Sequence, residues 1–94
     1  MEFEVEHEPG RRRFVTRTGE RESRLFYIPV APDVVDFRNT WVDPASRGQG
    51  VGEALVLAAL RWARDGGLRV IPTCGFVATV VRRHPEFEPL LTRR

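Results

Sequence analysis

The sequence predicts an α+β fold in which four strands form an antiparallel meander ahead of the first helix. Residues 2–42 contain four β-rich stretches separated by short turns, such as Pro9-Gly10 and Gly19-Glu20. A helical apolar pattern then covers 50–64, and a short β-rich segment at 68–71 follows it. Because a strand reached through a crossover helix joins the sheet parallel to the strand before it, the fifth strand should lie parallel to the fourth.

The first three strands follow from the apolar pattern. Residues 2–7 alternate strictly between glutamates and apolar or histidine side chains, which predicts a half-buried strand. Residues 12–18 form the second strand. Residues 22–30 are more continuously apolar, so the third strand should be central in the sheet. Pro29 and Pro32 should end it, because proline has no N–H to donate to a neighbouring strand.

The fourth strand, 34–42, has two faces by simple alternation. One face would carry Val35, Phe37, Asn39 and Trp41, and the other Val34, Asp36, Arg38, Thr40 and Val42. Asp43-Pro44 should end this strand. Beyond the fifth strand, residues 76–83 are expected to form a shorter second helix, and the tail 84–91 should pack back onto the domain.

Composition limits the organisation and the location of the protein. The chain has 94 residues, 41% of them apolar, which suits one domain covering 1–94. A single cysteine rules out an internal disulfide and favours a cytoplasmic protein. No apolar run approaches the ~20 residues of a membrane span, and the acidic N-terminus is unlike a signal peptide, so no membrane partner is expected.

The basic residues are unusual because all fifteen lysine and arginine positions hold arginine. No lysine is therefore available to form a Schiff base or to act as a general base. Clusters such as Arg11-Arg12-Arg13 and Arg82-Arg83 could contact nucleic acid. However, glutamates near the first cluster balance its charge and the net charge is only +2, so a solvated surface is favoured over a nucleic-acid interface.

A glycine-rich stretch stands between the fourth strand and the first helix. It consists of Arg47, Gly48, Gln49, Gly50, Val51 and Gly52. Glycines let the backbone approach a ligand closely, and the free N–H groups and dipole at a helix start favour an anion, so this stretch is a candidate phosphate-binding loop. The spacing and the four preceding strands exclude a dinucleotide fold, and the absence of lysine excludes a P-loop. The remaining alternative is that the glycines ease close packing of the helix on the sheet.

Residues 42–52, with the apolar helix that follows, resemble the coenzyme-A motif of the GNAT acetyltransferase superfamily. That motif runs Arg/Gln-x-x-Gly-x-Gly/Ala, and Arg47, Gly50 and Gly52 match it. The closer resemblance is to the small, cysteine-containing branch of the superfamily and covers nearly the whole chain. Its ordered segments are matched by Thr40-Trp41-Val42, Arg47-Gly48-Gln49-Gly50, Ala63-Arg64, Pro72-Thr73-Cys74-Gly75-Phe76 and His84-Pro85-Glu86-Phe87.

This resemblance implies a minimal GNAT-like fold that uses acetyl-CoA as cosubstrate and no metal. The loop amides would hold the pyrophosphate. A bulge in the fourth strand would supply an N–H that polarises the thioester carbonyl, and by resemblance this amide belongs near Trp41–Val42. The pantetheine arm would lie in a wedge between 37–42 and 68–72. Trp41, Val42, Cys74 and Phe76 join the loop residues as expected binding residues.

Cys74 is the candidate catalytic residue. It lies between a strand end and a helix start, where the helix dipole lowers the pKa of a thiol. The resemblance implies that Cys74 accepts the acetyl group before an amine receives it, which divides one acyl transfer into two steps. An inert, buried cysteine and direct transfer from acetyl-CoA to the amine both remain open.

No general base is evident in the sequence. His84 is expected to be a helix-terminal or surface residue, and His7 a satisfied core or edge residue. Relatives often carry histidine where this chain has Asn39, and asparagine cannot act as a base, so this departure weakens the catalytic case. Trp41 could cover the acetyl pocket or belong to the core.

The sequence therefore predicts an N-acetyltransferase that transfers an acetyl group to an unidentified amine. Larger superfamily members carry helices between the first two strands, where this chain has only Pro9-Gly10-Arg11. The acceptor side should then be open, which favours a macromolecular or exposed amine, or a partner chain that completes the site. The alternatives are a non-catalytic acyl-CoA-binding module and an arginine-rich nucleic-acid-binding domain. The oligomeric state is not predicted.

Overall fold

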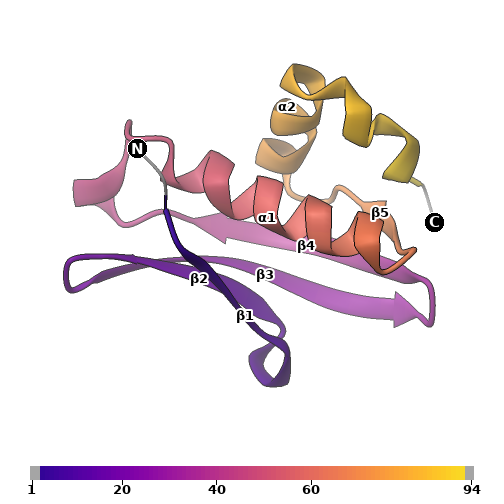
Figure 1. Cartoon of the computed structure of the whole chain (residues 1–94), viewed down its shortest axis with the longest axis horizontal. Coiled ribbons are helices and arrows are strands. Elements are labelled where there is room, and N and C mark those ends of the chain that lie inside the picture. The colour runs from indigo at the N-terminus through magenta and orange to yellow at the C-terminus, as the bar shows by residue number, and fades with distance from the viewer. Residues whose placement is uncertain (1–2, 93–94) are drawn as a thin grey trace.

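The computed structural model describes residues 3–92, and Figure 1 shows how its elements follow one another. The strands are β1 (Val5–Glu8), β2 (Arg13–Thr18), β3 (Arg21–Ala31), β4 (Val34–Trp41) and β5 (Arg69–Ile71). The α-helices are α1 (Val51–Asp65) and α2 (Gly75–Arg83). Short 3₁₀ turns lie at η1 (Pro9–Arg11), η2 (Pro44–Ser46) and η3 (Pro85–Leu90).

The strands form one sheet in the order β1-β2-β3-β4-β5. The first four pair antiparallel, and β5 pairs parallel with β4, which confirms the predicted meander and crossover. Strand β3 is the central strand, as expected. However, Pro29 lies inside β3 and does not end it, because a register shift between Pro29 and Ala31 accommodates the residue that cannot donate. The predicted first strand began at Glu2, which lies outside the described residues.

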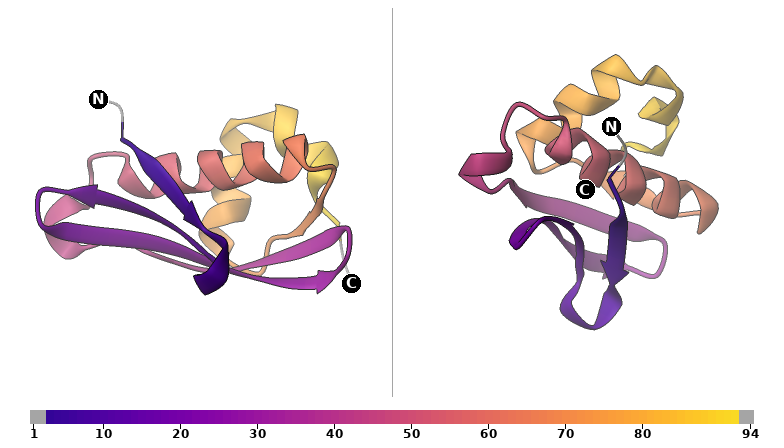
Figure 2. Two further views of the ribbon diagram at one scale, coloured as in Figure 1. Left: turned by 60° about the horizontal axis from the view of Figure 1, so that its bottom comes forward. Right: turned by 60° about the vertical axis from the view of Figure 1, so that its left-hand side comes forward.

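Both α-helices pack on the same face of the sheet (Figure 2). The hydrophobic core lies between the sheet and these helices, and at its centre Phe37 of β4 and Leu55 of α1 are completely buried. Other buried members are Phe14, Leu25, Tyr27, Val56, Ala59, Leu60, Ala63, Val77, Val80 and Phe87. The tail packs back as predicted, through Phe87 and through a bridge between Leu91 and Val70.

Strand β4 contains a β-bulge at Arg38. Tyr27 pairs with Phe37 and Phe26 with Asn39, so Arg38 has no partner on β3. One extra residue reverses the alternation of all side chains that follow it. The prediction that Asn39 and Trp41 share a face with Val35 and Phe37 is therefore wrong. Instead, Thr40 and Val42 turn toward the helices, and Asn39 and Trp41 turn toward the outer face.

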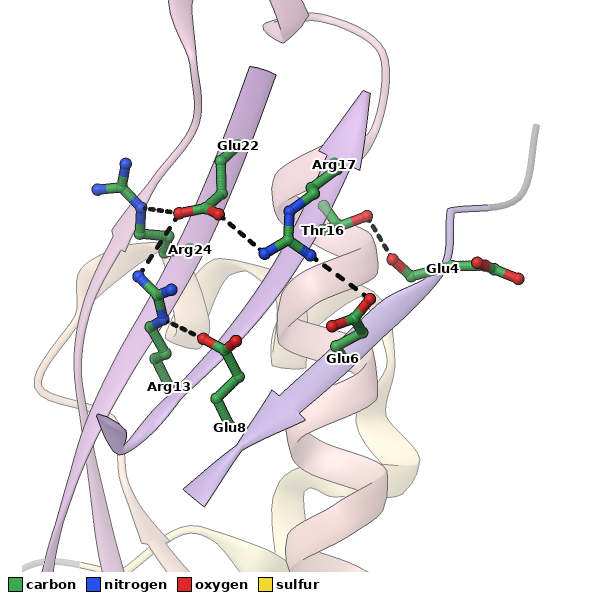
Figure 3. A network of polar contacts seen from close by, with 8 residues as sticks. All are labelled: Glu4, Glu6, Glu8, Arg13, Thr16, Arg17, Glu22 and Arg24. Carbon is green, nitrogen blue, oxygen red and sulfur yellow. Dashed lines mark hydrogen bonds and ion pairs between the residues drawn. The ribbon is translucent and has the colours of Figure 1, made fainter. Parts of the chain in front are cut away.

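The outer face of the sheet is stabilised by its own charged side chains (Figure 3). The ion pairs join Arg13 to Glu8 and Glu22, Arg17 to Glu6 and Glu22, and Arg24 to Glu22. The hydrogen bond from Arg24 is the main cause that lowers the pKa of Glu22. Arg24 also stacks over the ring of Trp41, 5.1 Å from its centroid. Arg13, from the arginine cluster near the N-terminus, thus pairs with glutamates.

His7 occupies the inner face of β1 and belongs to an aromatic cluster. Its ring stacks on Phe14 at a centroid distance of 4.3 Å and contacts Trp62, and its Nε2 lies 2.5 Å from the Tyr27 hydroxyl. Burial lowers the pKa of His7, so the neutral ring is favoured. His7 is therefore a satisfied edge-of-core residue, as expected from the sequence.

The burial of Phe37 predicts a large effect on stability. Replacing Phe37 by Ala should lower the free energy of unfolding by about 3–5 kcal/mol, because it opens a cavity between the sheet and both helices. The matched control is Ile28→Ala on the outer face, where the side chain is 40% exposed; its cost should stay below about 1 kcal/mol. Urea denaturation of both variants measures the difference, and equal losses would contradict the placement of the core.

Candidate functional site

The loop from Arg47 to Gly52 has the conformation of an anion-binding loop. Gly48 and Gly50 adopt left-handed backbone angles, with φ of +82° and +85°, which only glycine adopts without strain. Nothing lies within 4 Å of the position that a Cβ would take at either residue. Gly50 is the N-cap of α1 and no side chain caps the helix there, so the N–H groups of the first helical turn remain available to a ligand.

Gly52 has a different reason to be glycine. A Cβ at this position would lie 3.0 Å from the Phe76 ring and 3.1 Å from Cγ2 of Val42. Gly52 thus allows the start of α2 and the end of β4 to close on the start of α1. The alternative raised by the sequence, that glycines ease close packing, is correct for Gly52, whereas Gly48 and Gly50 face open space.

The base of the loop is fixed by polar contacts that the sequence analysis missed. The Asp43 carboxylate accepts from Arg21 at 3.3 Å, and the Asp43 N–H donates to Ser23 Oγ at 3.0 Å. The hydroxyls of Ser46 and Thr18 are hydrogen-bonded at 2.7 Å. These contacts tie the loop to β2 and β3. The Asp-Pro-Ala-Ser segment could have indicated this short helical turn, because aspartate before proline is a typical helix N-cap.

Strands β4 and β5 pair only from Val34 with Arg69 to Asp36 with Ile71. The last link is the Cys74 N–H, which donates to the carbonyl of Phe37 at 2.9 Å. Beyond this hydrogen bond, β4 continues, while the segment that follows β5 turns into α2. The expected wedge therefore exists, but its second wall is the start of α2, because 68–71 is paired up to its end.

A cavity of about 260 Å³ lies along this wedge and reaches the loop. Its lining residues are Thr40, Trp41, Val42, Arg47 and Phe76. Four of them were predicted as binding residues, and Thr40 was not. The bulge at Arg38 lies three residues before Trp41, so it does not coincide with the position expected for the polarising amide, Trp41–Val42.

Cys74 is the N-cap of α2 and lies across the wedge from β4. Its half-buried Sγ is 3.5 Å from Oγ1 of Thr40. Burial raises the pKa of the thiol, but hydrogen bonds from the Thr40 hydroxyl and from the backbone amides of Val77, Phe76 and Thr40 together lower it below its ordinary value. The direction of this shift agrees with the expectation for a thiol at a helix start.

Neither histidine lies beside Cys74. His84 follows α2, at its other end, which is roughly 14 Å away along the helix axis. Its Nε2 lies 3.6 Å from Glu53 and its Nδ1 4.0 Å from Glu86, as expected for a helix-terminal residue. His7 is on β1, three strands away from β4. Asn39 is exposed on the outer face.

A larger cavity, of about 630 Å³, lies on the outward side of α1. The N-terminal segment Phe3–Val5 forms one wall, and the helix residues Glu53, Leu57 and Arg61 form the other. Gln49 and Gly50 reach it from the loop. This cavity could not be predicted from the sequence, since it depends on where the segment before β1 runs.

Residues 3–92 contain no group of three or more histidine, cysteine, aspartate or glutamate side chains placed to bind a metal ion. Within the same range, neither α-helix has the length and apolar character needed to span a membrane.

Comparisons with known proteins identify the class that this fold defines. The family model for the GCN5-related N-acetyltransferases matches residues 13–90. In a solution NMR structure of a GCN5-like protein from Staphylococcus aureus, the fold is the same, with a TM-score of 0.73 and 22% identity over 97% of this chain and 89% of that one. The chain therefore belongs to the GCN5-related N-acetyltransferase family, as the sequence motifs indicated.

Similar individual proteins are found in vertebrates. The chain is 35% identical to Protein NATD1 of Bos taurus over 83 residues, which cover 86% of this chain and 74% of that protein. It is 33% identical to Protein NATD1 of Gallus gallus, over 88% of this chain and 77% of that protein. The human Protein NATD1 is similar at 34% identity, over 86% and 74% of the two chains.

The contacts of Cys74 predict that its thiol ionises at lower pH in the folded protein than in the unfolded chain. Because the sequence holds one cysteine, the rate of alkylation by iodoacetamide reports on Cys74 alone. The midpoint of its pH profile should lie lower in buffer than in denaturing urea. Equal midpoints, or a higher one in the folded state, would show that burial dominates and that the thiol is inert.

Proposed function

We propose that this protein is an N-acetyltransferase that takes an acetyl group from acetyl-CoA on Cys74 and passes it to an amine. One observation carries the proposal: the cavity in the wedge is lined by Arg47, the first residue of the glycine loop, and by Thr40, whose Oγ1 lies 3.5 Å from the Cys74 sulfur. A candidate phosphate-binding loop at one end of a cavity and a thiol of lowered pKa at the other suit a phosphate-bearing thioester. The family provides the same substrate class.

The residues of the opening have distinct roles in binding. The amides of Gly50, Val51 and Gly52 would hold the pyrophosphate, with the Arg47 guanidinium beside it. Arg47 Nε donates to the carbonyl of Val42 at 3.1 Å, which keeps the side chain at the mouth of the cavity. The cavity of about 260 Å³ is below the roughly 300–1,000 Å³ of drug-sized sites, so it suits the narrow pantetheine arm and leaves the nucleotide outside.

The proposed chemistry balances in two steps. The Cys74 thiolate attacks the acetyl carbonyl carbon, a new S–C bond forms, and the S–C bond to coenzyme A breaks, so coenzyme A leaves as a thiolate. A neutral amine then attacks the acetyl-cysteine carbonyl. The N–C bond forms, Cys74 leaves as a thiolate, and the amine releases one proton to solvent. This route requires no protein base next to the sulfur, which is consistent with the distant positions of both histidines.

The open sheet face supports a large acceptor. Only η1 (Pro9–Arg11) connects β1 and β2, and no helix of residues 3–92 covers the outer face (Figure 2). An exposed amine on a macromolecule could approach without a lid, so we propose this acceptor class. A non-catalytic acyl-CoA-binding module is the second candidate, because Asn39 is not a base and faces away from Cys74.

Intact-mass spectrometry tests the covalent route. Wild-type protein incubated with acetyl-CoA should gain one acetyl group, and Cys74→Ala should gain none. The modification should be reversed by hydroxylamine, which cleaves thioesters and spares amides. Subsequent addition of amine-bearing peptides should remove the acetyl group from the protein and add it to the peptide.

Three results would contradict parts of this proposal. Binding of acetyl-CoA without a mass gain, together with acetylated peptide, would establish direct transfer. Binding without either product would establish the acyl-CoA-binding module. A mass gain that persists in Cys74→Ala would show that another nucleophile accepts the group.

A further inference from the structure

Thr40 reaches the site only because of the bulge at Arg38. Simple alternation would place Thr40 on the outer face, beside the exposed side chain of Arg38. In the structure it pairs with the buried residue Leu25 and turns to the side that the helices cover. Its half-buried hydroxyl thus points into the wedge, where it lines the cavity described above.

The hydroxyl of Thr40 makes a side-chain contact across the wedge. Its Oγ1 lies 3.5 Å from Sγ of Cys74, which belongs to the opposite wall. The contact comes directly after the last backbone link, between the Cys74 N–H and the Phe37 carbonyl. Two successive contacts therefore fix Cys74 against β4, one through its backbone and one through its sulfur.

We infer that Thr40 is a positioning residue for Cys74: its hydroxyl holds the sulfur at the mouth of the wedge and donates a hydrogen bond to it when the thiol is ionised. This inference rests on the role proposed for Cys74 above. A threonine suits the task because its branched Cβ restricts χ1, so the hydroxyl has few other directions. A hydroxyl can also donate or accept, so the contact persists in both ionisation states of the thiol.

The sulfur is then surrounded by donors from both walls. From β4 come the hydroxyl and the backbone N–H of Thr40, and from the first turn of α2 comes the N–H of Phe76. The Val77 N–H lies nearby and also lowers the pKa of the thiol, although it donates to the Cys74 carbonyl at 3.0 Å. The Cys74 side chain forms no capping hydrogen bond with α2. The helix amides lower the pKa of the thiol, while the Thr40 hydroxyl contacts the sulfur directly.

The test uses the alkylation rate of Cys74 and requires no acetyl-CoA, so it is independent of whether acetyl transfer occurs. Thr40→Val removes the hydroxyl and keeps the shape, and Thr40→Ser keeps the hydroxyl. Thr79→Val is the matched control, because Thr79 lies on α2 and directs its hydroxyl to the Gly75 carbonyl. Circular dichroism checks that each variant is folded.

In Thr40→Val the midpoint of the pH profile should move up, and the rate at pH 7 should fall roughly three- to tenfold. Thr40→Ser should restore the wild-type midpoint, and Thr79→Val should leave it unchanged. Above the new midpoint, at high pH, the rates should converge. An unchanged midpoint in Thr40→Val, or a raised one in Thr40→Ser, would overturn the inference. If the valine variant fails to fold, Thr40→Ala against Thr40→Ser gives the same comparison.

If the pKa depends on Thr40 but acetyl-CoA never modifies Cys74, the inference about Thr40 holds and the proposed acetyl transfer is wrong. If Cys74 becomes acetylated at the same rate in wild type and Thr40→Val at pH 7, the transfer holds and the role of Thr40 is overturned. The two failures are therefore distinguishable.

Discussion

Strand β4 pairs with β3 from Val34 to Trp41, but it pairs with β5 only as far as Asp36. This difference, together with the extra residue at Arg38, determines the geometry of the candidate site. Separation from β5 opens the wedge, and the bulge turns Thr40 and Val42 into it. Without the bulge, the side chains of Asn39 and Trp41 would turn toward the helices in place of those of Thr40 and Val42. Cys74 would then face a different wall, with no hydroxyl at the position that Thr40 now takes.

The loop that follows β4 combines two requirements. Gly48 and Gly50 need left-handed backbone angles, and position 52 must lack a side chain because Phe76 and Val42 occupy the space that a Cβ would take. A substitution at Gly50 therefore strains the loop, whereas one at Gly52 moves the wall of the cavity. The contacts of Asp43 with Arg21 and Ser23 hold the loop in place before any ligand arrives. Such preorganisation reduces the conformational entropy that binding would otherwise cost.

Much of the fold could be predicted from the sequence, because strand alternation, helix periodicity and glycine position are local patterns. The meander, the parallel β5 and the place of the loop follow from them. The faces of β4 could not be predicted, since Arg38 carries no local sign of a bulge. Thr40 was missed for the same reason. The role of Gly52 depends on Phe76, which lies far along the chain, and the cavity beside Phe3–Val5 depends on tertiary packing.

The central claim is that the opening between β4 and α2 receives coenzyme A. NMR chemical-shift mapping of the ¹⁵N-labelled protein tests it most directly. Added coenzyme A should shift the amides of 48–52, Thr40 and Phe76, and Gly50→Val should abolish these shifts, because valine strains the loop and fills the space at the helix start. Shifts confined to Phe3–Val5 and Leu57, which line the larger cavity on the other side of α1, would contradict the account.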